Sequence, residues 1–537
     1  MITELGLERF QGFEIPQSIR LAPLTLIYGP NSGGKSSILR ALRLMDQAAN
    51  DPEGYSFNGP KISLGGFRPA VFSGDAKTTF KIELSQDCRD WRDAVQRRLA
   101  SRLFHDVKER GESLWNRAVR VSYEFDAAGD GYPVAISVAH TFALTEDENA
   151  PFNWDILPAE DVLKADIEFR RVDSDSDFSY QISHIEGNGV EKLAQVLFEA
   201  RSRRASGIPG DESSVGDFDQ NDLKLGDGWK KLILEDHFLL DEGTLPAKNR
   251  QGRSFLGDQT IERSATNTFS LRYFSFLRSI GMVPETSHIG PLRTISSNFE
   301  YLSPHQNLRS DGSNILSFLA SFPKDHLDTL SEWLQKMTEG RYGLQIISAY
   351  IGDGDSGSDG FRLTGADITN LYLKDFHTKT HVSPANAGVG LSQVLPVLAS
   401  LLVTFAPRPP GRRRSMVATM SRKDKLALIE QPELHLHPRM QAELADIFVN
   451  ALFNLGKPQD DGRAQLIVET HSEPLLMRLQ KLMAAGQIRP EDVSIVYVDQ
   501  FPGGGNLAQE LRMNADGSFK DSWPLSFSEL RWAEMGD

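Results

Sequence analysis

The sequence has almost no cysteine: Cys88 stands alone among 537 residues. One cysteine cannot form an intramolecular disulfide, and it excludes a zinc module built on several cysteines. So low a count fits a reducing compartment, and we expect the protein to be cytoplasmic.

Long apolar runs are also missing. The longest, residues 391–405, contains Gln393 and Pro396 and is shorter than the roughly 20 residues that a membrane-spanning helix needs. The first residues carry neither the basic segment nor the apolar segment of a signal peptide. We therefore expect no contact with a membrane and interpret residues 391–405 as a buried helix.

Positive charge is in deficit. The chain has 58 Lys and Arg against 73 Asp and Glu, a formal net charge of −15. A protein that coats nucleic acid without sequence preference is usually basic, so DNA could be bound only through a local patch. Residues 408–425 hold the densest basic stretch, interleaved with proline and glycine. This stretch is either a solvated loop or a loop that binds DNA or a protein partner.

A glycine-rich motif, residues 29–36, carries the strongest functional signal. Its sequence GPNSGGKS matches the phosphate loop GxxxxGK[ST], follows an apolar run and precedes a segment with helical periodicity. Glycines let backbone N–H groups and a helix N-terminus face one anion. Lys35 would reach the β- and γ-phosphates of ATP, and Ser36 would ligate Mg²⁺. The predicted nucleotide-binding residues here are Asn31, Ser32, Gly33, Gly34, Lys35, Ser36 and Ser37.

The second anchor for a metal in such a site is an acidic residue at the end of a hydrophobic strand. Residues 425–430, KLALIE, fit a buried strand that ends on Glu430. We expect Glu430 to hold Mg²⁺, directly or through water, together with Ser36.

These motifs resemble the OLD/RecF-like branch of the ABC-class ATPases. The resemblance covers about residues 1–85 and 281–537. It implies an ATPase subunit of the type found in two-component anti-phage systems such as PARIS or Septu. It is carried by the phosphate loop and by five further segments, 288–293 (HIGPLR), 388–396 (GVGLSQVLP), 426–438 (LALIEQPELHLHP), 469–472 (ETHS) and 523–527 (WPLSF).

The resemblance implies three further roles. Gly390 and Ser392 would form the signature segment at a helix start, which contacts the γ-phosphate of the nucleotide held by a partner protomer. ATP would thus be sandwiched in at least a homodimer. His471 would be the switch histidine near the same phosphate. Arg293 would be either a sensor of bound phosphate or a structural salt bridge, and both readings stay open.

The sequence departs from the family directly after the metal-binding acid. This position usually holds the glutamate that polarises the attacking water, and here it is Gln431. Glutamine can orient water but cannot take its proton. We expect slow ATP hydrolysis with Glu433 contributing. The alternative is a scaffold that binds ATP and hardly hydrolyses it.

The element pattern predicts an α/β fold. Strands alternating with helices indicate a P-loop ABC-type ATPase head with a mainly parallel, helix-covered sheet and an N-terminal antiparallel β layer, interrupted by a mixed or helical insert. The insert lacks sustained heptads and should be a compact lid rather than a rod. The predicted domains are 1–85 (first part of the head), 86–280 (insert), 281–498 (second part of the head) and 499–537 (small C-terminal extension).

The expected function is an ATP-driven switch. Only 38 residues follow Asp499, too few for the Toprim nuclease domain that OLD proteins often carry, so we expect the effector to be a separate chain. The family context suggests anti-phage defence, and a DNA-repair or DNA-organising clamp is the alternative. Two metal-like patterns are weak. The acidic turn 352–360 has Thr364 where a calcium loop needs glutamate, and His435 and His437 lack a third ligand.

Overall fold

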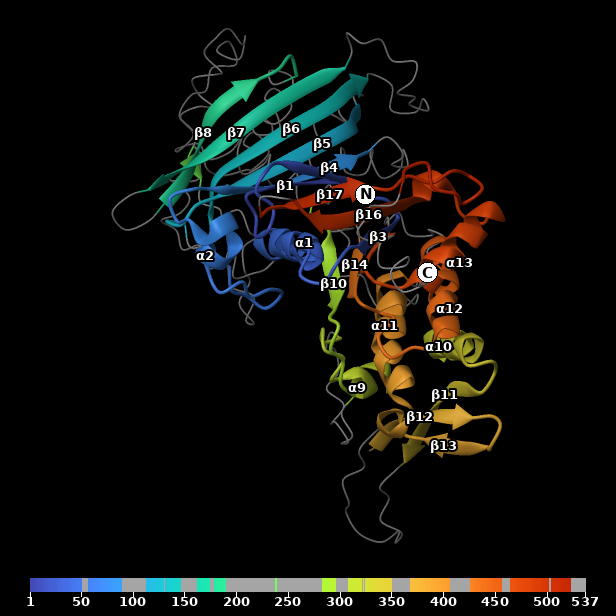
Figure 1. The fold of residues 1–537 in the computed structure, drawn as a ribbon. Helices are drawn as coiled ribbons and strands as arrows, with labels where there is room; N and C mark the ends of the chain where they lie inside the picture. Colours follow the sequence, from blue (N-terminus) through green and yellow to red (C-terminus); the bar gives the residue numbers. More distant parts are fainter. Residues whose placement is uncertain are drawn as a thin grey trace, which may run out of the picture.

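The computed structural model folds the chain into three β-sheets with their covering helices (Figure 1). It describes residues 1–50, 57–88, 113–129, 131–145, 162–173, 178–189, 237–238, 283–295, 308–320, 322, 324–349, 368–405, 425–455, 464–501 and 504–522. The acidic turn 352–360, the segment 523–527 and the basic stretch up to residue 424 lie outside the described residues.

The central sheet has the strand order β10-β14-β15-β3-β16-β17. Its first five strands run parallel to their neighbours, and β17 pairs antiparallel with β16. Every residue of β3 is buried, as expected for a parallel strand covered on both faces. The bounds are β3 Leu24–Tyr28, β10 Glu285–Ile289, β14 Lys425–Glu430, β15 Ala464–Glu469, β16 Val493–Gln500 and β17 Asn506–Glu510.

Helices cover both faces of the central sheet. Leu26 and Tyr28 of β3 join a core with α11 (Val389–Phe405), whereas Ile27 belongs to the core that contains α1 (Lys35–Asn50). The α11 side also includes α9 Ile315–Ala320, α10 Lys324–Met337, α12 Pro438–Val449, the π-helical turn Asn450–Leu455 and α13 Glu473–Ala484. Short helical turns occupy α2 Phe67–Ala70, Phe72–Gly74, Pro384–Asn386 and Pro490–Asp492.

The predicted buried helix is confirmed as α11, whose side chains are buried along most of its length. It begins one residue before Gly390 and ends at Phe405. Within the described ranges, no helix combines the length and the apolarity that crossing a membrane would require.

An eight-stranded antiparallel sheet shares the α1 core and extends to one side of the molecule (Figure 1). Its strand order is β2-β1-β4-β5-β6-β7-β8-β9. Stacked aromatic rings fill the core at its base, with Phe80 and Phe125 4.9 Å apart between ring centroids. The bounds are β1 Ile2–Glu8, β2 Gln17–Arg20, β4 Phe80–Asp87, β5 Ser113–Phe125, β6 Pro133–Thr145, β7 Leu163–Asp173, β8 Phe178–Glu186 and β9 His237–Phe238.

One buried side chain ties the two large sheets together. Gln465 of β15 accepts a hydrogen bond from the N–H of Ile2 and donates one to its carbonyl oxygen, both at 2.8 Å. Both residues are 1% exposed. A buried polar group left without its partner costs about 1–3 kcal/mol, so this double bond fixes β1 against β15.

A small antiparallel sheet, β11-β12-β13, lies at the far end of the helical side (Figure 1). Its strands are β11 Tyr342–Ala349, β12 Ile368–Asp375 and β13 Thr380–Val382. β11 and β12 pair antiparallel along their whole length, from Tyr342 with Asp375 to Ala349 with Ile368.

Two of the predicted domain boundaries fall inside strands. Residue 85 lies within β4, which pairs with β5 of the predicted insert, and residue 498 lies within β16, which pairs with β17. Where residues 86–280 are described, they form strands rather than helices, and these strands extend the N-terminal β layer. The described part of the predicted C-terminal extension adds β17 to the central sheet.

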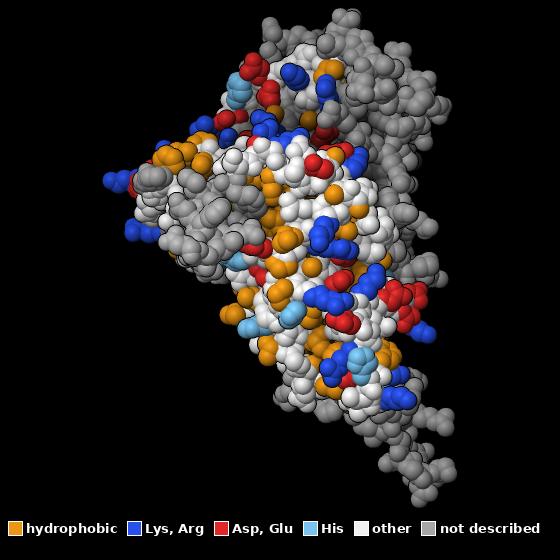
Figure 2. Space-filling model, turned by 45° about the vertical axis from the view of Figure 1, so that its right-hand side comes forward, with side chains coloured by type: hydrophobic (Ala, Val, Ile, Leu, Met, Phe, Trp, Pro, Cys, Tyr) orange, Lys and Arg blue, Asp and Glu red, His pale blue; other side chains and the backbone are white. Residues whose placement is uncertain are grey.

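Lys, Arg, Asp and Glu side chains lie intermixed on the face shown in Figure 2. The described residues of this face form no continuous basic surface of the kind that unspecific DNA binding needs.

Candidate nucleotide-binding site

The turn after β3 has the backbone of a phosphate loop. Gly29, Ser32 and Gly34 take positive φ angles of 146°, 63° and 91°. A β-carbon on Gly34 would lie 1.9 Å from Nδ2 of Asn506 on β17, so only glycine fits at this position. The loop leads directly into the N-terminus of α1, where free backbone N–H groups favour an anion.

Lys35 folds back over this loop. Its Nζ donates to the carbonyl oxygens of Gly29 at 3.0 Å and Pro30 at 2.8 Å, and the residue is 4% exposed. Burial lowers the pKa of Lys35, against the charges of Glu469 and Glu433, which act to raise it. An ammonium held by two carbonyl groups at the loop can exchange them for phosphate oxygens, which bind it more strongly.

Ser36 is hydrogen-bonded to a glutamate that the sequence analysis did not single out. Its hydroxyl donates to Oε2 of Glu469 at 2.7 Å. Glu469 is the last residue of β15, the strand beside β3, and is 5% exposed. Burial raises the pKa of Glu469, and the nearby charge of Glu430 raises it further, while the hydrogen bond from Ser36 lowers it.

Glu430, the predicted metal ligand, ends β14, one strand farther from β3. It is in register with Glu469, and its Oε1 lies 2.7 Å from Nε2 of His288 on β10. Burial acts to raise the pKa of Glu430, but the hydrogen bond and charge of His288 and the charge of Arg43 hold it below its usual value. Glu430 therefore lies in the predicted place but bonds to a histidine and not to Ser36.

Glu433 holds the loop that carries the predicted switch histidine. Its Oε2 accepts a hydrogen bond from the hydroxyl of Thr470 at 2.8 Å, and its Oε1 accepts one from the backbone N–H of His471 at 2.7 Å. Burial raises the pKa of Glu433. Partial burial and the charge of Lys35 lower the pKa of His471, whose side chain stays exposed at this edge.

Arg293 joins three segments of the site through carbonyl oxygens. Its guanidinium donates to the carbonyl oxygens of Glu430, Gln431 and Gln393, and the side chain of Gln393 donates back to the Arg293 carbonyl at 2.7 Å. Burial lowers the pKa of Arg293 to about 10. It forms no ion pair with any described residue, so the structure shows a hydrogen-bonded brace in place of the salt-bridge alternative.

Gln431 turns the chain sharply at the end of β14. Its φ angle is 44°, and its N–H donates to the carbonyl oxygen of Glu469 at 2.7 Å. This bond continues the β14–β15 pairing one residue past the strand and places Gln431 at the same edge as the three glutamates.

Gly390 and Ser392 lie in the first turn of α11. A β-carbon on Gly390 would lie 2.8 Å from the carbonyl oxygen of His435, so the helix start approaches the loop after β14 too closely for a side chain. The hydroxyl of Ser392 donates to the carbonyl oxygen of Val389 at 2.8 Å. Val389 is 59% exposed. The predicted signature segment therefore faces outward and, among the described residues, makes no hydrogen bond to its own phosphate loop.

The donors at this edge fit Mg²⁺. Magnesium in nucleotide sites keeps several waters and binds one or two carboxylates together with substrate phosphates. The hydroxyl of Ser36 and the carboxylates of Glu469 and Glu430 are hard oxygen donors of this kind. A bound Mg²⁺ would supply positive charge against the phosphates.

The weak histidine metal reading finds no support. His437 caps α12 by accepting a hydrogen bond on Nδ1 from the N–H of Arg439 at 3.3 Å. In the part of the chain that the structure describes, no three or more His, Cys, Asp or Glu side chains are grouped to hold a metal without outside ligands.

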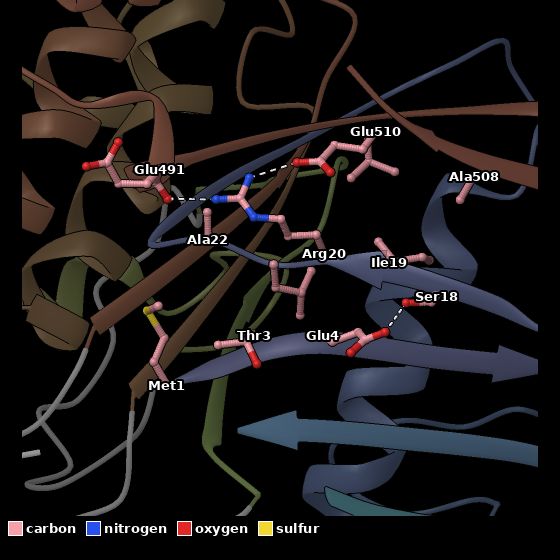
Figure 3. Close-up of a pocket in the computed structure, with 12 residues that line it drawn as sticks. Met1, Thr3, Glu4, Ser18, Ile19, Arg20, Ala22, Glu491, Ala508 and Glu510 are labelled. Atoms are coloured by element: carbon pink, nitrogen blue, oxygen red, sulfur yellow. Dashed lines mark hydrogen bonds and ion pairs between the residues drawn. The ribbon is translucent and has the colours of Figure 1, made fainter. Parts of the chain in front are cut away.

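A separate hollow of about 480 Å³ lies at the opposite edge of the central sheet (Figure 3). Its walls include residues just before β3 and β16, whereas the phosphate loop follows the carboxyl end of β3. Arg20 there pairs with Glu510 at 2.7 Å and donates to the carbonyl oxygen of Glu491 at 2.9 Å. The only arginine of the lining is therefore engaged, and the hollow does not compete as an anion site.

Most of the predicted site residues meet at the carboxyl edge of the central sheet. Asn31 and Ser32 lie exposed at the tip of the phosphate loop, Gly33 is buried beneath it, and Ser37 is buried in α1. Two residues were missed, Glu469 and His288. The same pattern that marked Glu430, an acid at the end of an apolar strand, could have marked Glu469. The residues that gather at this edge are Gly34, Lys35, Ser36, Glu430, Gln431, Glu433 and His471.

The family of the chain follows from its sequence as a whole. Residues 24–478 match the family model described as "AAA domain, putative AbiEii toxin, Type IV TA system". The matched span is most of the chain and contains both the phosphate loop and His471. The chain belongs to this AAA-domain family. The predicted P-loop ATPase is thereby confirmed at the level of the family, and the OLD/RecF-like assignment within it stays a prediction.

Three solved structures similar to the chain are heads of SMC proteins, and each of the three is distant. One is an SMC head domain from Thermotoga maritima, with 8% identity over 95% of this chain and 99% of that chain. Two others are an Smc head bound to the C-winged helix domain of ScpA and an Smc head with an extended coiled coil from Pyrococcus furiosus, bound to the C-terminal domain of ScpA. Both are 12% identical, over 96% and 99% of this chain and 98% and 99% of theirs. The TM-score is 0.33 in each case, too low to carry a conclusion about function. No curated protein matches the chain.

Replacing Glu469 or Glu430 by glutamine should change stability in opposite directions. The raised pKa of Glu469 means that its ionised form opposes folding, so Glu469→Gln should raise the melting temperature at pH 8. This gain should shrink as the pH falls through the raised pKa toward the unfolded value of about 4.3. The lowered pKa of Glu430 means that its ionised form supports folding above about 4.3, so Glu430→Gln should lower the melting temperature at pH 8.

Thermal melts of the two variants and the unaltered protein, from pH 8 downward, measure both effects. The Glu430→Gln deficit should disappear only as the pH falls to the lowered pKa of Glu430. Shifts of the same sign at pH 8 would contradict the opposite environments of these two carboxylates.

Proposed function

We propose that this AAA-domain protein binds ATP with Mg²⁺ between two copies of the chain and hydrolyses it slowly as a switch. One observation carries the proposal: Lys35, Ser36, three glutamates and the backbone of His471 converge at the carboxyl edge of one parallel sheet, beside a helix N-terminus. This edge is where open α/β sheets bind nucleotides.

The outward position of Ser392 supports the homodimer. The first turn of α11 is not hydrogen-bonded to the phosphate loop of its own chain, and Val389 beside it is exposed. A contact from Ser392 to the γ-phosphate would then come from a second copy, so ATP would join the two protomers. Because ATP binds the closed pair better than the open one, its hydrolysis releases the pair.

The geometry around Glu433 supports slow hydrolysis. Both of its carboxylate oxygens accept hydrogen bonds, from Thr470 and from the N–H of His471, and the adjacent polar side chain is Gln431. We propose that Gln431 orients the water while Glu433 contributes through its hold on the His471 loop.

A separate effector chain completes the proposal. The description of the family names a putative toxin of a toxin–antitoxin system. This fits an ATPase whose nucleotide-bound state decides whether a harmful activity is released. We propose that the ATP-bound dimer controls such an effector, a nuclease in the first instance, in defence against phage.

Two defective variants should restore activity when they are mixed. Lys35→Ala disables the phosphate loop and Ser392→Arg blocks the signature turn, so each alone should lose nearly all turnover. In a mixed dimer the intact loop of one chain faces the intact signature of the other. Random pairing of equal amounts should return about one quarter of the wild-type rate, because half of the dimers regain one of two sites. Phosphate release measures this, and no recovery would contradict the shared site.

Glu433→Gln should lower phosphate release by about 100-fold or more if Glu433 supplies a base, since general bases contribute at least that much. ATP affinity should stay near that of the unaltered protein, because Glu433 does not contact the phosphate loop in the structure. Glu443→Gln, on α12, is the matched control and should leave the rate unchanged. An unchanged rate in Glu433→Gln would remove Glu433 from catalysis.

The product of the neighbouring reading frame should bind this protein in a nucleotide-dependent way. Tagged protein should retain it with a non-hydrolysable ATP analogue, and Lys35→Ala, which cannot hold the analogue, should not. Co-purification of the two expressed chains measures this. Equal retention by both forms, or by neither, would contradict control by ATP.

A further inference from the structure

We propose that Glu469, and not Glu430, is the protein carboxylate that holds the nucleotide's Mg²⁺ together with Ser36. This inference rests on the proposed ATP site and names a ligand that the family pattern does not supply. It concerns two glutamates in neighbouring strands, of which only one touches the phosphate-loop serine.

Strand order decides which carboxylate reaches the serine. β15 lies between β14 and β3, and neighbouring strands are roughly 4.8 Å apart. Glu469 therefore starts one strand from β3, whereas Glu430 starts two strands away, in register with Glu469 and on the same face. The hydroxyl of Ser36 lies 2.7 Å from Oε2 of Glu469. A metal bound to the Ser36 hydroxyl would therefore lie closer to the carboxylate of Glu469 than to that of Glu430.

Glu430 is held on the opposite side. His288 comes from β10, which pairs with β14 on the edge away from β15. The Nε2–Oε1 distance is 2.7 Å, and the His288 and Glu430 side chains are 11% and 16% exposed. The imidazole thus draws the Glu430 carboxylate away from Ser36 and leaves it suited to hold a water of the metal or to orient its neighbours.

Charge at the site favours a cation between the serine and the two glutamates. Glu430 and Glu469 end adjacent strands, and each is largely buried. Two carboxylates brought together out of water repel one another, and a divalent cation beside them removes that cost. To ligate a metal, the Ser36 hydroxyl would keep its proton and turn it away from Glu469, which would free both oxygens as ligands.

Binding of Mn²⁺, a paramagnetic substitute for Mg²⁺, tests the assignment without depending on turnover. The full chain is titrated with Mn²⁺ in the presence of a non-hydrolysable ATP analogue, and bound metal is counted by electron paramagnetic resonance. The variants are Glu469→Gln and Glu430→Gln, with Glu491→Gln at the far edge of the sheet as the control. Glutamine keeps the shape and can still accept the Ser36 hydrogen bond, and thermal melts confirm folding. Glu469→Asp tests whether a carboxylate restores binding.

Glu469→Gln should weaken nucleotide-dependent Mn²⁺ binding at least about tenfold more than Glu430→Gln, whose loss should stay within the range of about 10- to 100-fold typical of a supporting residue. Binding of the analogue without metal should be equal in all forms, and Glu469→Asp should recover part of the loss. Losses that are equal, or larger in Glu430→Gln, would overturn the assignment while leaving the ATP site intact. If the unaltered protein showed no nucleotide-dependent Mn²⁺ binding, the ATP site and this assignment would fall together.

Discussion

The pairing of β15 with β14 on one side and β3 on the other is the constraint on which the site depends. Parallel strands end at one edge, so residues from distant parts of the chain meet there. The phosphate loop follows β3, Glu430 ends β14 and Glu469 ends β15. Shifting β15 by one residue would turn Glu469 to the opposite face and break its bond to Ser36.

Glu430, Glu433 and Glu469 gather at this edge, and their surroundings shift their pKa values in two directions. The pKa of Glu430 is held below its usual value beside His288 despite its partial burial, whereas burial raises the pKa values of Glu433 and Glu469. Carboxylates gathered out of water repel one another, and a divalent cation beside them reduces that cost. The carboxylates therefore favour a cation at this edge, while Lys35 and the helix N-terminus favour the phosphates that accompany it.

Individual helices and strands of the head could be predicted from the sequence better than the order in which the strands pair. The phosphate loop, the strand ending on Glu430 and α11 were found because each has a local signature, a glycine turn or an apolar period. Glu469 ends an apolar strand just as Glu430 does, but which of the two reaches Ser36 depends on strand order, and only the sheet shows that β15 separates β14 from β3. The strands of the predicted insert were missed in part because pairing between distant strands leaves a weaker mark on the sequence than a helical period does.

The two hydrogen bonds between Gln465 and Ile2 join the eight-stranded sheet to the central sheet. Gln465 lies on the strand that ends in Glu469, and Ile2 opens the strand to which β4 and then β5 to β9 are added in sequence. Separating β1 from the central sheet would leave the buried amide of Gln465 and the backbone of Ile2 without these bonds, on the very strand that ends at Glu469.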